Sequence, residues 1–225
     1  MIKKRIDFFK EFLTDQRWDV FNKVIDERTR YMSVVLEDIY QSQNASAVLR
    51  TCDCFGVQDV HVIENVNQFK INPDVVLGST KWLNLYNYNS FENNTLSTIQ
   101  TLKSNGYRIV ATTPHNNDVE LDNFDLEKGK FALFFGSELP GLSNIVMENA
   151  DEFLKIPMYG FTESFNISVS AAIILHHLTF KLRKSLIEWK LSEIEKDEIL
   201  YNWIKTSVKD SDKIEKEYYR RKKML

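Results

Sequence analysis

Apolar and polar residues alternate along this chain in blocks that predict strands and helices in turn. Short apolar runs typical of buried strands cover 33–39, 59–63, 108–112, 130–135 and 152–156, with a more mixed β-leaning stretch at 82–88. Apolar positions at helical spacing predict helices at 3–13, 20–28, 44–55, 92–104, 143–149, 166–186, 192–208 and 212–223. The pattern is that of an α/β protein.

The order of these elements favours parallel strand pairing. A strand, a helix ended by Gly56 and a second strand at 59–63 lie close together in sequence, as in a parallel crossover unit. The run at 130–135 is nearly all apolar, as expected for a central strand covered on both faces. We expect a parallel sheet with helices on both faces at 31–187, a helical N-terminal arm at 1–30 and a helical C-terminal extension at 188–225.

The composition predicts a single hydrophobic core and a cytoplasmic location. The 225 residues are 43% hydrophobic, which is ample for a single core, and no linker-like stretch divides them. Polar residues interrupt every long apolar stretch, and the chain opens on a charged amphipathic helix. Cys52 and Cys54 diverge on a predicted helix and cannot bridge each other. We expect a soluble cytoplasmic protein with reduced thiols, no membrane segment and no secretory signal.

The charge of the chain leaves open whether it binds nucleic acid. The formal net charge is −3 and the pI is near 5.9, which argues mildly against binding by bulk electrostatics. Basic residues nevertheless cluster at Lys3–Arg5, at Lys181, Arg183 and Lys184, and at Arg220–Lys223. These clusters either contact phosphates or form solvated ends of the chain.

Three segments carry polar residues or glycines at the ends of apolar runs. They are Asn44–Arg50, Phe134–Gly141, and Ile156–Gly160 followed by Ser164–Ser168. Ligands bind parallel α/β sheets outside the carboxyl ends of the strands, so we expect these segments to share one cleft.

Each polar residue in these segments also has a structural interpretation. Asn44 is placed to cap a helix, and Arg50 to pair with Asp53 or lie on the surface. Glu138 is either a ligand-facing carboxylate or a solvated loop acid. Ser164 and Asn166 open a long helix, where they would cap it and also receive a polar ligand.

Several kinds of site are disfavoured by the sequence. His61 and His115 have no carboxylate or cysteine at metal spacing, and the pair His176 and His177 lies deep in a helix, so we assign no metal. A nucleophile-elbow motif is missing, as are the glycine-rich dinucleotide fingerprint and the phosphate-binding P-loop. The absent fingerprint counts against a nicotinamide-dependent dehydrogenase, the competing function at the level of the fold.

From about Val34 to Leu178 the chain resembles the TrmH family of the SPOUT superfamily, the RNA ribose 2′-O-methyltransferases. The three segments match the three family motifs in order. The resemblance implies an S-adenosylmethionine-dependent enzyme that acts on RNA. It also implies an α/β-knot with a deep C-terminal trefoil knot, and a homodimer with the cofactor pocket at its interface.

The resemblance also implies residue roles. Arg50 matches the catalytic arginine and Asn44 the asparagine that supports it, while Glu138, Ser164 and Asn166 match the remaining functional polar positions. Residues that match the cofactor-binding positions are Thr112, Gly136, Ile156 and Phe165. This chain departs from the family at Phe165, where leucine is usual, and at Gln41–Gln43, which lacks the usual proline. Arg50 would either assist deprotonation of the 2′-hydroxyl or anchor a phosphate.

The terminal helices refine the expected substrate. A short arm before the core and two helices after it resemble family members that methylate a guanosine in the tRNA D-loop. The alternatives are 2′-O-methylation of ribosomal RNA or of another tRNA position, and an inactive RNA-binding protein on the same scaffold.

Overall fold

The computed structural model describes residues 2–114, 119–138 and 140–223, with side chains as far as Arg220. His115, Leu139 and the side chains of the last basic cluster beyond Arg220 lie outside the described residues. The chain divides into two compact units, one of residues 29–189 and one that joins residues 1–28 to 190–225.

The larger unit is built on a seven-stranded sheet in which every strand pair is parallel, in the order β3-β2-β1-β6-β4-β7-β5. The strands are β1 (Met32–Glu37), β2 (Asp59–Ile63), β3 (Asn84–Tyr88), β4 (Arg108–Thr112), β5 (Val119–Glu120), β6 (Phe131–Phe135) and β7 (Glu152–Lys155). The predicted parallel sheet is confirmed, and the short strand β5 was not predicted.

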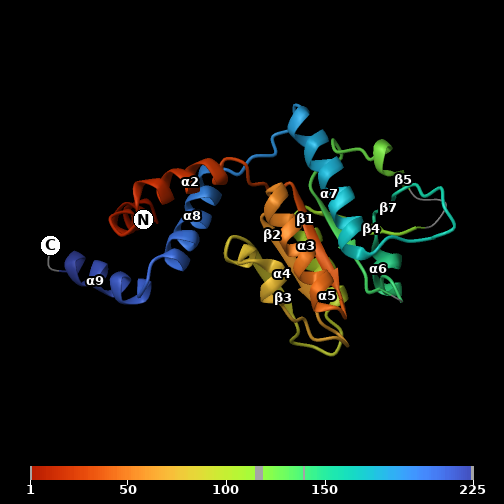
Figure 1. Cartoon of the computed structure of the whole chain (residues 1–225), viewed down its shortest axis with the longest axis horizontal. Coiled ribbons are helices and arrows are strands. Elements are labelled where there is room, and N and C mark those ends of the chain that lie inside the picture. The colour runs from red at the N-terminus through yellow and green to blue at the C-terminus, as the bar shows by residue number, and fades with distance from the viewer. Residues whose placement is uncertain (1, 115–118, 139, 224–225) are drawn as a thin grey trace. The chain divides into compact units, whose positions relative to one another are not determined.

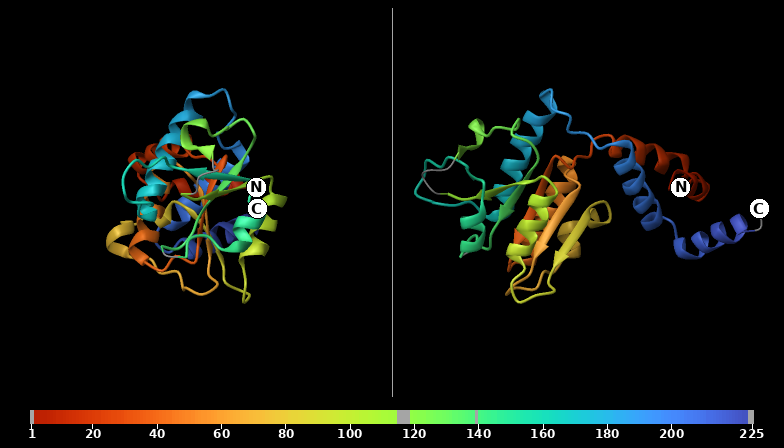
Figure 2. Two further views of the ribbon diagram at one scale, coloured as in Figure 1. Left: turned by 90° about the vertical axis from the view of Figure 1, so that its right-hand side faces the viewer. Right: turned by 180° about the vertical axis from the view of Figure 1, so that it is seen from behind.

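Helices cover both faces of this sheet, as predicted (Figure 1; Figure 2). On one face α3 (Ser42–Phe55) and α7 (Ile167–Lys184) enclose a core with Val34 and Leu36 of β1. On the other face α5 (Thr95–Ser104) and α6 (Asn144–Asn149) enclose a core with Val35. This alternation follows from strand geometry, in which successive side chains point to opposite faces.

Most predicted helices are present with shifted ends, and one predicted cap is wrong. Gly56 ends α3 with φ 78°, in the left-handed conformation expected of a terminal glycine. Asn44 does not cap that helix, because the helix begins at Ser42 and the Gln41 carbonyl already accepts from the Ala45 amide at 3.2 Å. The sequence pattern also missed α4 (Pro73–Val76) and the 3₁₀ turns Ser79–Lys81 and Leu121–Asn123.

The smaller unit contains α1 (Ile2–Lys10), α2 (Asp15–Ile25), α8 (Glu193–Ser207) and α9 (Ser211–Lys223). Phe9 is fully buried and its ring lies 5.9 Å from that of Tyr201 on α8. Glu215 of α9 accepts from Arg5 at 3.3 Å and from Lys205 at 2.8 Å. The two terminal stretches, far apart in sequence, therefore form one helical unit.

Within the described residues, no helix is both long and apolar enough to cross a membrane.

Candidate functional site

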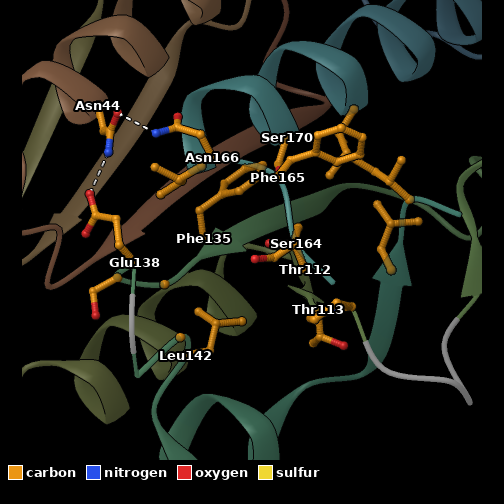
Figure 3. Close-up of a pocket in the computed structure, with 18 of the residues that line it drawn as sticks. Asn44, Thr112, Thr113, Phe135, Glu138, Leu142, Ser164, Phe165, Asn166 and Ser170 are labelled. Carbon is orange, nitrogen blue, oxygen red and sulfur yellow. Dashed lines mark hydrogen bonds between the residues drawn. The ribbon is translucent and has the colours of Figure 1, made fainter. Parts of the chain in front are cut away.

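A cavity of about 600 Å³ lies in the larger unit beyond the carboxyl ends of β4, β6 and β7 (Figure 3). Its walls come from four parts of the chain: the start of α3, the end of β4, the loop after β6, and the segment that leads from β7 into α7. The cavity volume lies within the range typical of small-molecule sites. The three segments singled out in the sequence thus converge on one hollow.

Eight of the nine residues predicted for the site line this cavity. They are Asn44, Thr112, Gly136, Glu138, Ile156, Ser164, Phe165 and Asn166. The ninth, Arg50, does not line it.

Asn44 is the centre of a hydrogen-bonded network on the cavity wall (Figure 3). Its amide nitrogen donates to Glu138 Oε1 at 2.7 Å and to Gln41 Oε1 at 3.1 Å, and its carbonyl oxygen accepts from Asn166 Nδ2 at 3.0 Å. Asn44 is 7% exposed, so its amide is held by these partners and not by solvent. The network fixes the Glu138 carboxylate relative to the first turn of α7.

Asn166 joins the network to the N-terminus of α7. Its side-chain oxygen accepts from the Ser168 amide at 2.9 Å and from the Ser168 hydroxyl at 2.6 Å, as a helix N-cap does. Asn166 therefore has the capping role expected of this segment, while its Nδ2 group faces Asn44.

The loop after β6 forms a tight turn that only glycine permits at its first position. Ser137 and Gly141 exchange two backbone hydrogen bonds of 3.1 and 3.0 Å. A Cβ atom on Gly136 would lie 2.2 Å from the carbonyl carbon of Gly141, far inside van der Waals contact. The two hydrogen bonds hold Ser137 and Gly141 together, and Glu138 lies in the turn between them.

The deeper wall combines apolar side chains with hydroxyl groups. Phe135, Leu142, Leu154, Ile156, Phe165, Ile167 and Ile174 supply the apolar area. Thr112 donates its hydroxyl to the Phe134 carbonyl at 2.7 Å, and Ser164 adds a second hydroxyl to the lining. Segment 156–165 has no regular secondary structure, so its backbone groups are not committed to a helix or strand ladder. Such a lining fits a ligand with an aromatic base and several polar groups.

Arg50 lies on an exposed part of α3, and no hydrogen bond or ion pair joins it to another described residue. Its position follows from helix geometry, since six residues separate it from Asn44 and carry it to a different side of the helix. The ion pair with Asp53 considered from the sequence is not formed.

The sequence analysis missed some cavity residues and one buried carboxylate, which lies at the end of β1. Gln41 was noted only as a departure from the family pattern, yet its side chain reaches Asn44. Thr113, Met158 and Ser170 also line the cavity. Glu37, at the end of a mostly apolar strand, is 2% exposed, and a lone acid in such a run was the signal available. Among the described residues, no cluster of metal-ligating side chains is present.

Comparisons with known proteins agree with this geometry. Residues 31–176 match the SpoU rRNA Methylase family. Over 214 residues, 95% of this chain and 96% of the relative, the chain is 46% identical to a tRNA (guanosine(18)-2′-O)-methyltransferase of Borreliella burgdorferi. It is 30% identical over 192 residues to the Aquifex aeolicus protein of the same name, covering 84% of this chain and 89% of the relative.

Solved structures give the same result. The crystal structure of the A. aeolicus TrmH/SpoU tRNA modifying enzyme superposes with a TM-score of 0.74 at 30% identity, covering 84% of this chain and 95% of that chain. The SpoU methyltransferase AviRb from Streptomyces viridochromogenes, solved with the cofactor AdoMet, shares the fold with a TM-score of 0.60 at 22% identity, over 72% of this chain and 62% of that one. By family match, by near full-length similarity and by fold, this chain belongs to the SpoU methylase family.

Proposed function

We propose that this protein transfers a methyl group from S-adenosylmethionine to the ribose 2′-hydroxyl of a guanosine in the D-loop of tRNA. The observation that carries the proposal is the convergence of three motif segments on one cavity, in a chain that matches tRNA guanosine methyltransferases along almost its whole length. The mixture of apolar side chains and hydroxyl groups in the cavity lining supports a ligand that, like S-adenosylmethionine, carries an aromatic base and several polar groups. Cavity and similarity thus support the same reaction.

In this proposal Thr112, Gly136, Ile156 and Phe165 hold the cofactor. When bound, S-adenosylmethionine supplies an activated methyl group on a positively charged sulfur. The loop backbone at Gly136 and the irregular segment beginning at Ile156 offer polar groups to the ligand, while the Phe165 ring and Ile156 provide apolar contact.

The protein must then align the 2′-hydroxyl and help its proton to leave. Alignment of the reacting groups supplies much of the rate enhancement in reactions of this kind. Asn44 keeps Glu138 and Asn166 in fixed positions at the cavity wall, and Ser164 adds a hydroxyl to the same cavity. These groups are placed to orient the ribose.

Arg50 keeps two roles in this proposal, assistance in deprotonation and anchoring of a phosphate. Its guanidinium is a poor base because it remains protonated in proteins. Its exposed position supports the phosphate role, since RNA lying over the cavity would reach the surface of α3.

We also infer a homodimer, in which a second copy completes the cofactor pocket, a trefoil knot in the segment that includes α7, and a cytoplasmic location. Support for the knot and the dimer comes from the family resemblance. Tyr159 and Phe161 lie in the irregular segment between β7 and α7, and their side chains, 96% and 108% exposed, supply apolar surface that a second copy would cover.

The decisive experiment maps 2′-O-methylated nucleotides in tRNA and ribosomal RNA from cells that lack this protein. We expect a methyl group to be lost from one D-loop guanosine and regained when the wild-type gene is restored. Loss confined to ribosomal RNA would overturn the substrate assignment. An unchanged map, together with no heat of binding for S-adenosylmethionine in calorimetry, would indicate the inactive RNA-binding protein.

A further inference from the structure

Glu37 is a buried carboxylate that none of the family motifs described above contains. It is the last residue of β1 and is 2% exposed. Its side chain lies on the same face of the sheet as that of Val35, because residues two apart in a strand share a face. That face carries the core covered by α5 and α6.

Two neighbouring residues direct their hydrogen-bond donors at this carboxylate. Oε1 accepts from the Ser143 hydroxyl at 2.7 Å and from the Thr95 hydroxyl at 2.6 Å, and Oε2 accepts from the Ser143 backbone amide at 2.9 Å. Burial of a carboxylate is costly unless such donors satisfy it, and hydrogen bonds to a charged acceptor are the strong ones.

The two hydroxyls are also oriented from their other side. The Ser143 oxygen accepts from the Val146 amide at 3.3 Å, and the Thr95 oxygen accepts from Asn65 Nδ2 at 2.9 Å. Each hydroxyl has a single hydrogen, and with the oxygen engaged as an acceptor elsewhere that hydrogen is directed to Glu37. The site is therefore built for an acceptor at position 37.

Through Ser143, Glu37 holds one end of the loop that forms the cavity. The loop leaves the sheet after Phe135, which pairs with Leu36 of β1, and it ends at Ser143, the N-cap of α6. Both ends of the loop are thereby attached to the final residues of β1. Two backbone hydrogen bonds join Ser137 to Gly141, and the backbone of Gly141 packs against Gly136. A shift at either end of the loop would therefore move Glu138 and the backbone at Gly136 together.

We propose that Glu37 is a positioning residue, which sets the cofactor-binding conformation of loop 136–142 through Ser143. This inference rests on the proposed function, since it concerns the affinity of the same cavity for S-adenosylmethionine. A role in positioning can be separated from a role in stability, because Glu37 also contacts Thr95 of α5, which is not part of the loop.

The test compares Glu37→Gln with wild type in the full-length protein. The substituted amide would direct N–H groups at donors, so the Ser143 contacts would weaken. We expect the dissociation constant for S-adenosylmethionine, measured by calorimetry, to rise about tenfold or more, which is the size of effect that loss of a hydrogen bond to a charged group produces.

Matched variants separate positioning from stability. Ser143→Ala should weaken cofactor binding as Glu37→Gln does, whereas Thr95→Val should lower the melting temperature and leave the affinity within about twofold of wild type. Ile99→Ala, in the same core, is the control for destabilisation alone, and Glu148→Gln, exposed on α6, is the control for loss of a carboxylate.

Equal affinity in wild type and Glu37→Gln would overturn the inference, as would weakened binding in Thr95→Val equal to that in Ser143→Ala. If Glu37→Gln does not fold, the comparison of the Ser143 and Thr95 variants decides alone. Failure of the wild-type protein to bind S-adenosylmethionine would contradict the proposed function instead, so the two failures are distinguishable.

Discussion

At the scale of single residues, the arrangement of the polar cavity wall depends on Asn44, whose side-chain amide both donates and accepts hydrogen bonds. The nitrogen of that amide donates to Glu138 and Gln41, and its oxygen accepts from Asn166. An asparagine in the first turn of a predicted helix is normally interpreted as a cap, and that interpretation is wrong here because the helix starts two residues earlier. Only the fold could reveal the network, since its partners lie 94 and 122 residues away in sequence.

Asn44→Ala should lower the rate of methyl transfer about tenfold to a hundredfold, because Glu138 and Asn166 lose their common partner. Thermal stability should change little, since both partners are exposed to water. Single-turnover kinetics with saturating S-adenosylmethionine and tRNA measures this. A rate equal to wild type would show that the network does not serve the reaction.

Gly136→Ala should abolish cofactor binding and lower the melting temperature, because the added Cβ would lie 2.2 Å from backbone atoms of Gly141. The matched control is Gly160→Ala, where an added Cβ meets no atom within 4 Å. Calorimetry with S-adenosylmethionine and a thermal melt test both variants. Normal binding by Gly136→Ala would contradict the close packing of this loop.

At the scale of elements, the apolar runs predicted the central strands well because they are buried on both faces. β2 and β4 have the predicted bounds, and β6 is shorter by one residue. The two residues of β5 carry too little pattern to be recognised, and α4 is a single turn begun by Pro73. Elements held by tertiary contacts instead of by their own periodicity were therefore missed.

The edge pair β2–β3 carries a buried histidine with a consequence for stability. The His61 ring stacks on Tyr86 and Tyr88, with centroids 4.8 and 5.8 Å apart, and its Nδ1 lies 3.0 Å from the Tyr88 hydroxyl. Burial lowers the pKa of His61 to about 4 from an ordinary value of 6.5. Asp59, two residues before His61 on the same strand, forms an ion pair with Arg30 at 3.0 Å.

Because the pKa of His61 is lower in the folded state, the unfolded chain takes up a proton first as the pH falls. The free energy of unfolding should therefore hold above pH 6.5 and fall by up to about 3 kcal/mol as the pH approaches 4. In His61→Phe, which keeps an aromatic ring but cannot titrate, this part of the decline should vanish. Denaturant melts across this range measure the difference, and parallel profiles for both proteins would refute the assignment.

At the scale of the whole molecule, the sequence predicted the family and the segments that meet at the cavity, but not the joining of the two ends of the chain. The hydrogen bond from the Thr29 hydroxyl to the Trp189 carbonyl, 2.6 Å long, brings the first and last residues of the larger unit together. The stretches beyond them pack into one helical unit, a long-range contact that local patterns do not encode.

The proposed dimer is tested by light scattering of the purified protein in moderate salt. The expected mass is twice the 26.5 kDa of one chain, because the cofactor pocket is proposed to need a second copy. Tyr159→Ser together with Phe161→Ser should weaken the dimer by removing exposed apolar surface. A fully active monomer would exclude the dimer from the mechanism.

The most direct test of the central claim is methylation of unmodified tRNA transcripts by the purified protein with S-adenosylmethionine, followed by nuclease digestion and mass spectrometry. We expect a single added methyl group on the ribose of one D-loop guanosine, and none when that nucleotide already carries a 2′-O-methyl group. A methyl group on a base, or transfer to ribosomal RNA with none to tRNA, would contradict it.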